Sequence, residues 1–308
     1  MDKPMRVAVI GVGHLGSIHA RIYSQLKPAQ LVAVCDTLPD RARSVAAELG
    51  CDAVTDARDL IGRVDAVSIA VPTHSHYPLA KLFLSAGIHA LVEKPFTRTV
   101  QEADRLLQLA QKNQAVVQVG HVERFNAALR RVHTSLTCPR FVEVHRLAPF
   151  QPRGTEVGVV LDLMIHDLDI LLWLVKNPVR RVEAVGVRVL TPFEDIANAR
   201  ITFQNGAVAN LTASRISKEA MRKFRIFQPD AYVSIDFLGQ AVDLFRCRQG
   251  QISHEQMTIS GEEPLKAELA SFLDAAQTRN TPPVSGPQAR EALALALKIT
   301  RLIQKNHP

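Results

Sequence analysis

Short apolar runs alternate with amphipathic stretches over the first 120 residues of the chain. The runs predict buried strands, and the stretches between them repeat their apolar positions with the period of a helix. Five or six strands that alternate with helices favour an α/β Rossmann domain built on a doubly wound parallel sheet. The predicted strands span residues 6–10, 31–34, 53–54, 65–71, 89–92 and 115–119, and the helices span 17–26, 41–49, 77–86 and 100–112.

Beyond Gly120, apolar and polar positions alternate, which is typical of strands with one buried face. Residues 181–190, 196–204 and 232–238 show this alternation, and Asn205-Gly206 is a strong hairpin signal. The pattern predicts an α+β domain with an open-faced, mostly antiparallel sheet. Terminal helices are expected at 264–278 and 289–304. The chain should therefore form two domains, residues 1–120 and 121–308, with helix 289–304 as a segment that could pack back on the first domain.

Composition limits the classes of function. Of the 308 residues, 47% are hydrophobic and 22% are charged, as in ordinary globular proteins, and no apolar run is long enough to span a membrane. The four cysteines form no C-x-x-C pair, so we expect neither a zinc site nor a disulfide framework, and a cytoplasmic location. The net charge of +7 comes from scattered Lys and Arg with few aromatics, which suits anionic small molecules better than nucleic acid.

A glycine-rich loop follows the first predicted strand. Gly11-Val12-Gly13-His14-Leu15-Gly16 is a G-x-G-x-x-G sequence between a strand and a helix, the arrangement that binds a dinucleotide pyrophosphate. Asp36 lies twenty residues after Gly16, where a carboxylate accepts hydrogen bonds from the adenosine ribose. We expect NAD as the cofactor, preferred over NADP because Asp36 would repel a 2′-phosphate. The residues expected to bind it here are Gly11, Gly13, His14, Leu15, Gly16 and Asp36. The alternative is a structural glycine turn.

Polar residues follow two further strands directly. Pro72, Thr73 and His76 come after one strand, and Glu93-Lys94-Pro95 comes after the next. The carboxyl ends of strands in an open parallel sheet face the ligand crevice. Lysine is rarely buried, and proline cannot continue a central strand, so Lys94 is predicted to point at the reactive end of the dinucleotide. The alternative is a solvated lysine after a strand end.

A second group of polar residues lies in an apolar stretch at 160–175. Asp162, His166 and Asp169 stand at i, i+4 and i+7, so a helix would place them on one face. Burying such a stripe is costly unless its members are paired or open to a cleft. A structural polar network and a metal site are the alternatives. No H-x-x-x-H or E-x-x-H pattern accompanies the stripe, so no metal is predicted.

Taken together, these motifs resemble the glucose-fructose oxidoreductase and inositol dehydrogenase (Gfo/Idh/MocA) family. The matching pieces are Gly11–Gly16 with His19, Asp36, Pro72-Thr73-x-x-His76, Glu93-Lys94-Pro95, Asp162-x-x-x-His166, and a C-terminal stretch with Glu268, Phe272, Pro283 and Leu293. The resemblance implies Lys94, Asp162 and His166 as catalytic residues, and adds Pro72, Thr73, His76, Glu93 and Lys94 to the cofactor site. It also implies a homodimer or homotetramer formed through the open sheet. One departure is the stretch 154–160, which has fewer glycines than in many relatives.

The expected chemistry is oxidation of a secondary alcohol on a sugar. His166 would take the hydroxyl proton as hydride leaves for NAD, Lys94 would stabilise charge on the same oxygen, and Asp162 would orient the pair. Whether Lys94 or His166 is the base stays open. The alternatives are an inositol or free-sugar dehydrogenase, an NAD-dependent glycoside-cleaving enzyme and a non-catalytic NAD-sensing regulator.

The expected substrate rests on two features. The stretches 120–126 and 161–167 are similar to the branch of the family that makes 3-keto nucleotide sugars for the 3-amino sugars of lipid A. Several arginines suit a diphosphate, namely Arg124, Arg153, Arg215, Arg222 and Arg225, although solvated surface or oligomer contacts are the alternative. We expect UDP-N-acetylglucosamine to be oxidised at its 3-hydroxyl and the ketone to pass to an aminotransferase. The expected substrate-binding residues are Arg124, Asn126, Arg153, Asp162 and His166.

Overall fold

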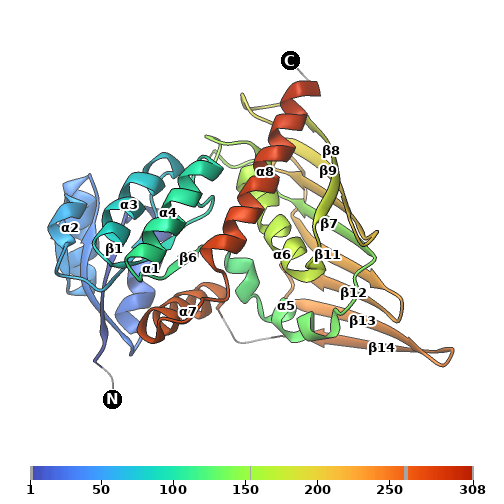
Figure 1. The fold of residues 1–308 in the computed structure, drawn as a ribbon, viewed down its shortest axis with the longest axis horizontal. Coiled ribbons are helices and arrows are strands. Elements are labelled where there is room, and N and C mark those ends of the chain that lie inside the picture. Colours follow the sequence, from blue (N-terminus) through green and yellow to red (C-terminus); the bar gives the residue numbers. More distant parts are fainter. Residues whose placement is uncertain (1–2, 153, 260–262, 307–308) are drawn as a thin grey trace. The chain divides into compact units, whose positions relative to one another are not determined.

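The computed structural model describes residues 3–152, 154–259 and 263–306, and the chain divides into two compact units (Figure 1). The first unit comprises Met1–His121 and Glu263–Arg290, and the second comprises Val122–Glu262 and Glu291–Pro308. The chain passes from the first unit to the second one residue beyond the predicted change of pattern at Gly120. No helix in the described part of the chain is both long and apolar enough to cross a membrane.

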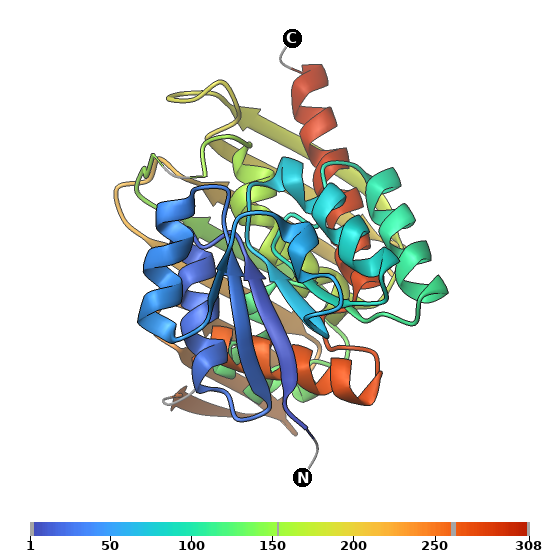
Figure 2. The ribbon, with the colours of Figure 1, turned by 90° about the vertical axis from the view of Figure 1, so that its left-hand side faces the viewer.

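A six-stranded parallel sheet forms the centre of the first unit, with the strand order β3-β2-β1-β4-β5-β6. Figure 2 shows its blue strands β1 and β2 side by side, with helices packed around them. The strands are β1 (Met5–Ile10), β2 (Ala29–Cys35), β3 (Asp52–Val54), β4 (Ala66–Ile69), β5 (His89–Val92) and β6 (Val117–Val119). The helices are α1 (His14–Gln25), α2 (Pro39–Leu49), α3 (His76–Ser85), α4 (Val100–Lys112) and α7 (Pro264–Thr278), with 3-10 turns η1 (Ala57–Leu60) and η2 (Thr73–Ser75). This sheet confirms the predicted Rossmann domain.

Helix α7 belongs to the first unit, although its position late in the chain placed it in the predicted second domain. Its residues Leu269, Phe272 and Leu273 are fully buried in the same core cluster as Val9 of β1 and Tyr23 of α1. Fully burying such side chains stabilises a fold by roughly 1.5–3 kcal/mol each. The difference arises because the apolar stripe of α7 is visible in the sequence, whereas the surface that it covers is not.

An eight-stranded sheet forms the second unit, with the order β14-β13-β12-β11-β7-β10-β9-β8. Every neighbouring pair is antiparallel except β7 and β10, which run parallel. The strands are β7 (Phe141–Leu147), β8 (Val179–Val187), β9 (Ile196–Phe203), β10 (Val208–Ser214), β11 (Met221–Gln228), β12 (Ala231–Asp236), β13 (Ala241–Arg248) and β14 (Gln251–Thr258). The mostly antiparallel sheet of the prediction is confirmed.

The two faces of this sheet differ in burial. Alternate residues such as Ile201, Phe203, Phe224 and Ile226 are buried, and their neighbours point to the other, more exposed face. The buried face adjoins the helical part of the unit, to which η5 contributes by packing against β10. The helical elements are η3 (Val122–Phe125), α5 (Ala127–Val132), η4 (His133–Ser135), η5 (Val160–Met164) and α6 (Ile165–Val175).

Helix α8 (Gly286–Asn306) is shared by the two units. Its first turn lies in the first unit, where Arg290 pairs with Asp104 of α4 at 2.9 Å. From Glu291 onward it belongs to the second unit, where Ile303 packs so closely on Gly186 of β8 that a Cβ there would lie 2.8 Å from it. The helix predicted at 289–304 is therefore present, and most of its length lies with the second unit.

Candidate functional site

The loop between β1 and α1 is built as a dinucleotide loop requires. Gly11 has a φ of +82°, and a Cβ on it would lie 2.7 Å from the carbonyl oxygen of Ala70. A Cβ on Gly16 would lie only 1.7 Å from the carbonyl oxygen of Gly11, so the helix can approach the strand only with glycine there. Gly13, in contrast, has no atom within 4 Å of its Cβ position, which leaves its side open. Gly11 thus allows the tight turn, Gly13 leaves room for a pyrophosphate to approach the backbone, and Gly16 allows the helix to pack closely on the strand, in the order expected of a dinucleotide loop.

Asp36 follows β2 and lies beside this loop. Its carboxylate accepts hydrogen bonds from the backbone N–H groups of Val12 at 3.0 Å and Leu38 at 2.9 Å, and its Oδ2 lies 3.3 Å from Nη1 of Arg41. Only 6% of the residue is exposed. The carboxylate is therefore fixed against the glycine loop, where an adenosine ribose would reach it.

A cavity of about 940 Å³ opens beside Asp36. Its lining includes Gly11, Gly13, Asp36, Pro72 and His74, together with apolar side chains of α3. The combination of an apolar wall, an open glycine backbone and a fixed carboxylate fits the adenosine half of NAD. Four of the predicted cofactor residues therefore line one cavity.

The other predicted cofactor residues are not among those that line this cavity. His14 and Leu15 form the first turn of α1, and Thr73 begins η2. His76 is different, because it is 1% exposed and its ring nitrogens lie 2.8 Å from the carbonyl oxygens of Val71 and Pro95. Burial lowers the pKa of His76. Its imidazole thus ties two strand-end segments together inside the unit instead of facing the cavity.

Lys94 lies two residues beyond the last residue of β5, close to the strand end as the sequence predicted, and is half-buried. Its backbone N–H donates to Oε2 of Glu93 at 3.2 Å. Glu93 is 7% exposed and lies so close to Gly120 that a Cβ on the glycine would come within 2.7 Å of the carboxylate. The peptide bond from Lys94 to Pro95 is cis. The ends of β5 and β6 therefore enclose Glu93 next to Lys94.

A buried histidine contacts the carboxylate of Glu93. His19 of α1 is fully buried, with Nε2 3.3 Å from Oε1 of Glu93 and Nδ1 2.7 Å from Oγ of Ser68. Burial raises the pKa of Glu93. The hydrogen bond and charge of His19, together with Lys94, lower this pKa by more than burial raises it, so the net pKa lies below its ordinary value. Glu93 is thus held as a carboxylate beside Lys94. Sequence reasoning missed Ser68, whose small polar side chain in an apolar strand was the available signal.

In the second unit, Asp162 and His166 lie on successive turns and are both half-buried. The segment is not one regular helix, because Val160–Met164 forms a π-helical turn before α6 begins at Ile165. Asp169, the third member of the predicted stripe, lies three residues after His166 on α6, is 2% exposed and pairs with Nη1 of Arg124 at 3.4 Å. The π-helical turn precedes both His166 and Asp169, so their i, i+3 spacing on α6 is that of a regular helix.

Most of the arginines predicted to meet a diphosphate have partners inside the second unit. The guanidinium of Arg124 also lies 4.1 Å over the ring of Trp173. Arg225 pairs with Glu143 at 2.8 Å, and Arg222 lies 3.8 Å from Glu123. Arg215 is 4% exposed and donates to two backbone carbonyls. Arg153 lies outside the described residues. Asn126, predicted as a substrate ligand, caps α5 by accepting from the N–H of Ala128 at 3.0 Å.

A buried ionic group that sequence reasoning missed joins β7 to this region. Arg146 is 3% exposed and donates to Oδ1 and Oδ2 of Asp167 and to Oε1 of Glu123, each at 2.8 Å. Burial raises the pKa of Asp167 even though Arg146 opposes the shift. Its partners are 23 and 21 residues away in sequence, so no local pattern could reveal the group.

Replacing Arg146 with Met is expected to destabilise the protein by about 3–5 kcal/mol, because two buried carboxylates lose their counter-charge. Urea unfolding followed by circular dichroism measures the change. Arg181→Met is the control, since Arg181 forms an exposed pair with Glu183 whose contribution should be about 0–1 kcal/mol. Equal stabilities of the two variants would contradict the expectation.

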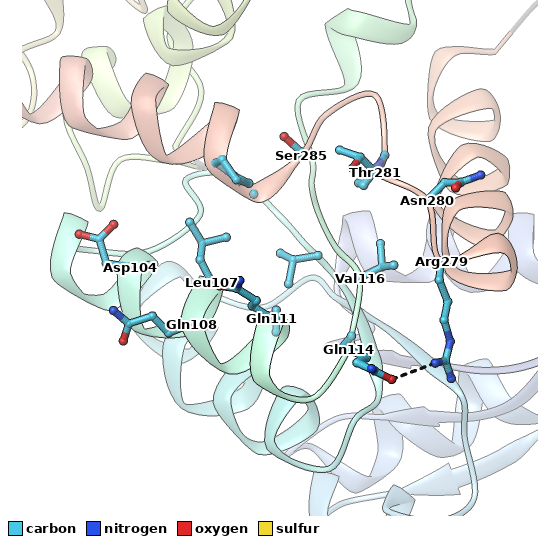
Figure 3. A pocket seen from close by; sticks show the side chains of 16 residues that line it. Asp104, Leu107, Gln108, Gln111, Gln114, Val116, Arg279, Asn280, Thr281 and Ser285 are labelled. Atoms are coloured by element: carbon cyan, nitrogen blue, oxygen red, sulfur yellow. Dashed lines mark hydrogen bonds between the residues drawn. The ribbon is translucent and has the colours of Figure 1, made fainter.

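A second cavity of about 930 Å³ lies elsewhere in the first unit, between α4 and the segment that joins α7 to α8 (Figure 3). Its two charged side chains are already engaged, because Asp104 pairs with Arg290 and Arg279 donates to Oε1 of Gln114 at 3.2 Å. The remaining lining is amide, hydroxyl and apolar. It therefore lacks the acid–base groups that catalysis needs, and among the described residues no group of three metal-ligating side chains was found.

Comparison with known proteins shows the family of the chain. A family model described as the oxidoreductase family with an NAD-binding Rossmann fold matches residues 5–121, and the GFO/IDH/MocA C-terminal domain model matches residues 118–233. The UDP-N-acetylglucosamine 3-dehydrogenase of Acidithiobacillus ferrooxidans is 40% identical over 302 residues, or 96% of each chain. A solved structure of that enzyme superposes with a TM-score of 0.93 over 99% of each chain.

Inositol dehydrogenases are more distant relatives. The myo-inositol 2-dehydrogenase of Thermotoga maritima is 25% identical, covering 98% of this chain and 97% of its own. A scyllo-inositol dehydrogenase from Lactobacillus casei, solved with NAD(H) and scyllo-inositol, is 19% identical with a TM-score of 0.83 over 99% of this chain and 98% of its own, which shows a shared fold. With both family models matched and a 40% identical relative of nearly equal length, the chain belongs to the Gfo/Idh/MocA family of oxidoreductases and carries its NAD-binding Rossmann domain.

Proposed function

We propose that this oxidoreductase oxidises the 3-hydroxyl of UDP-N-acetylglucosamine with NAD and yields the 3-keto nucleotide sugar. The observation that carries the proposal is the 40% identity, over 96% of the chain, to a UDP-N-acetylglucosamine 3-dehydrogenase. The inositol dehydrogenases among the relatives are less similar over the full length, which makes a cyclitol the second candidate.

The first unit would hold the cofactor. The open backbone at Gly13 and the fixed carboxylate of Asp36 fit the pyrophosphate and the adenosine ribose. When bound, NAD supplies the acceptor for the hydride that leaves the sugar carbon. Lys94 would lie at the nicotinamide end, since it follows β5 in the same sheet and is positioned by the buried pair of Glu93 and His19.

Two side chains are proposed to act on the sugar hydroxyl. His166 would accept it as the general base, since an imidazole exchanges protons near neutral pH. Lys94 would donate a hydrogen bond to the sugar oxygen and stabilise the charge that develops there. Asp162, one turn before His166, would orient the base. The diphosphate contacts are not assigned to Arg124 or Arg215, because both guanidiniums have partners in the interior of the second unit.

The substrate is tested with a panel of UDP-N-acetylglucosamine, its uronic-acid relative, myo-inositol and free hexoses, each with NAD and followed by NADH absorbance. Oxidation of a plain alcohol is uphill near neutral pH, so a second assay adds glutamate and an aminotransferase and looks for the 3-amino product by mass. NADH from myo-inositol or a hexose, with none from either nucleotide sugar, replaces the proposal by a cyclitol or free-sugar dehydrogenase. Release of free sugar without net NADH indicates glycoside cleavage instead. Tight NAD binding with no turnover of any compound favours a regulator.

We also propose that the outer face of the large sheet forms a homo-oligomer. Five rings on adjacent strands form a row there, with centroid distances of 5.6, 4.6, 5.6 and 4.1 Å between successive members; the first pair is tilted and the other three are stacked. They are Phe141, Phe227, Tyr232, Phe245 and His254. Exposed apolar patches of this kind are typical of interfaces between proteins, and a second copy of the chain supplies an equal row.

Replacing Phe227 with Glu is expected to shift the protein towards the monomer, because it places a charge within the row of rings that the second copy would bury. Light scattering after gel filtration measures the mass of the particle. Ile61→Glu is the control, since Ile61 is an exposed apolar residue of the first unit. An unchanged mass for Phe227→Glu would remove the row from the interface.

A further inference from the structure

We propose that Arg215 is a positioning residue that clamps the segment Gly154–Val157 and thereby holds Asp162 in place for the reaction. The proposal rests on the proposed function in so far as Asp162 serves the chemistry. The charge of Arg215 suggested a phosphate ligand, but its guanidinium binds backbone carbonyls inside the second unit.

The guanidinium of Arg215 is occupied by backbone carbonyls. Nη1 donates to the carbonyl oxygen of Gly154 at 2.9 Å, and Nη2 donates to that of Val157 at 2.6 Å. The residue follows β10, and only 4% of it is exposed. The planar fork of a guanidinium fixes two acceptors at once, which a lysine cannot do. One side chain thus holds both ends of a four-residue segment.

The clamp is itself held from the opposite side. Nε of Arg215 lies 3.7 Å from Oδ1 of Asp195, and the backbone N–H of Arg215 donates to the carbonyl oxygen of Asp195 at 2.9 Å. Asp195 is fully buried and accepts from the N–H groups of three residues, Val189, Leu190 and Thr191, at 2.7–2.9 Å. Burial raises its pKa, but these hydrogen bonds outweigh it and lower the pKa to about 2. A permanent carboxylate therefore faces the guanidinium.

The neighbouring Glu194 secures the end of the same segment. Its carbonyl oxygen accepts from the N–H of Val159 at 2.9 Å. Its carboxylate lies so close to Gly158 that a Cβ on the glycine would be 1.9 Å away. The stretch from Gly154 to Val159 is thus fixed at three points before the helical turn that carries Asp162 begins.

Gly154 links the clamp to Asp162, because its backbone lies beside the Asp162 side chain. It has a φ of +78°, and a Cβ on it would lie 3.0 Å from Oδ2 of Asp162. The backbone at Gly154 is therefore in close approach to the carboxylate. Since Arg215 fixes the carbonyl of this same residue, a loss of the clamp would move one wall of the space around Asp162. A displacement of 1 Å at a catalytic group can cost about 10²-fold in rate.

The test compares Arg215→Lys with Arg181→Lys, which alters an exposed arginine of β8 in the same unit. For Arg215→Lys we expect kcat/KM for UDP-N-acetylglucosamine to fall by about 10²-fold, mainly through kcat, with the Kd for NAD unchanged. Added guanidinium should restore part of the turnover of Arg215→Ala. Gly154→Ala should lower turnover similarly while Arg215 stays intact, because the new methyl group meets the Asp162 carboxylate. Arg181→Lys should leave all these quantities unchanged.

Amide hydrogen exchange, measured without substrate, separates this proposal from the proposed function. Faster exchange confined to residues 154–162 in Arg215→Lys supports the clamp. Unchanged exchange there overturns it, whatever happens to turnover. If the unaltered protein does not oxidise UDP-N-acetylglucosamine, the proposed function fails, and the exchange result still decides the role of Arg215.

Discussion

Alanine at His166 or at Lys94 is expected to lower turnover by about 10²–10⁴-fold, the usual loss when an acid–base group is removed. His166 would no longer take the hydroxyl proton, and Lys94 would no longer stabilise the charge on the oxygen. The Kd for NAD should change little for His166→Ala, because the cavity beside Asp36 belongs entirely to the first unit. Steady-state kinetics with UDP-N-acetylglucosamine and NAD titration by fluorescence give the two quantities.

The controls are chosen from side chains of the same type. Lys112→Ala removes an exposed lysine from the last turn of α4, and His133→Ala removes a histidine that stacks on Trp173 at 5.0 Å. Both should turn over substrate at near-normal rates. If Lys94→Ala and His166→Ala behave like these controls, neither residue takes part in the chemistry.

The second large effect is expected at Asp36, where alanine should reduce the preference for NAD over NADP. Hydrogen bonds to a charged group contribute about 1.5–3 kcal/mol, so the affinity for NAD should fall by roughly 10–100-fold. The kcat/KM for NADP should rise relative to that for NAD, because the carboxylate that repels the 2′-phosphate of NADP is gone. Nη1 of Arg41, which lies 3.3 Å from Oδ2 of Asp36, would then be available to the phosphate. The ratio of kcat/KM for the two cofactors measures the change.

Asp40→Ala serves as the comparison for Asp36→Ala. Asp40 lies on α2, and its side chain, which is 97% exposed, pairs only at the surface with Arg43. Its replacement should leave the NAD to NADP ratio as it was. A ratio that is equally unaffected in Asp36→Ala would mean that the ribose is held by some other group.

Much of the first unit could be predicted because its signals are local. The glycine loop, the strand ends at Asp36 and Lys94, and the period of α4 all lie within a few residues of the features they specify. The second sheet was harder. Strand β14 carries polar residues at most positions and is largely exposed, so it has no apolar alternation to detect. Strand β11 alternates with Arg and Lys on its outer face, and these obscured the pattern.

The candidate site shows a similar limit. The spacing of Asp162 and His166 made them candidates, but the ion pair of Asp169 with Arg124 could not be foreseen, because the two residues are 45 positions apart. The arginines that were predicted to meet a diphosphate show a further limit. The partners of Arg215 lie 58 and 61 residues earlier in the chain, and that of Arg124 lies 45 residues later. Charge counts alone cannot separate a cation that meets a ligand from one that satisfies distant backbone.

The return of the chain to the first unit, through α7, has a practical consequence for engineering. A fragment that stops at His121 would lack Leu269, Phe272 and Leu273, and would expose the apolar surface of α1 that they cover. Exchanging substrate domains between relatives by a single crossover near residue 121 would likewise pair each cofactor domain with a foreign α7. A recombination scheme for this chain therefore has to carry residues 263–290 along with the N-terminal segment, as one inherited block.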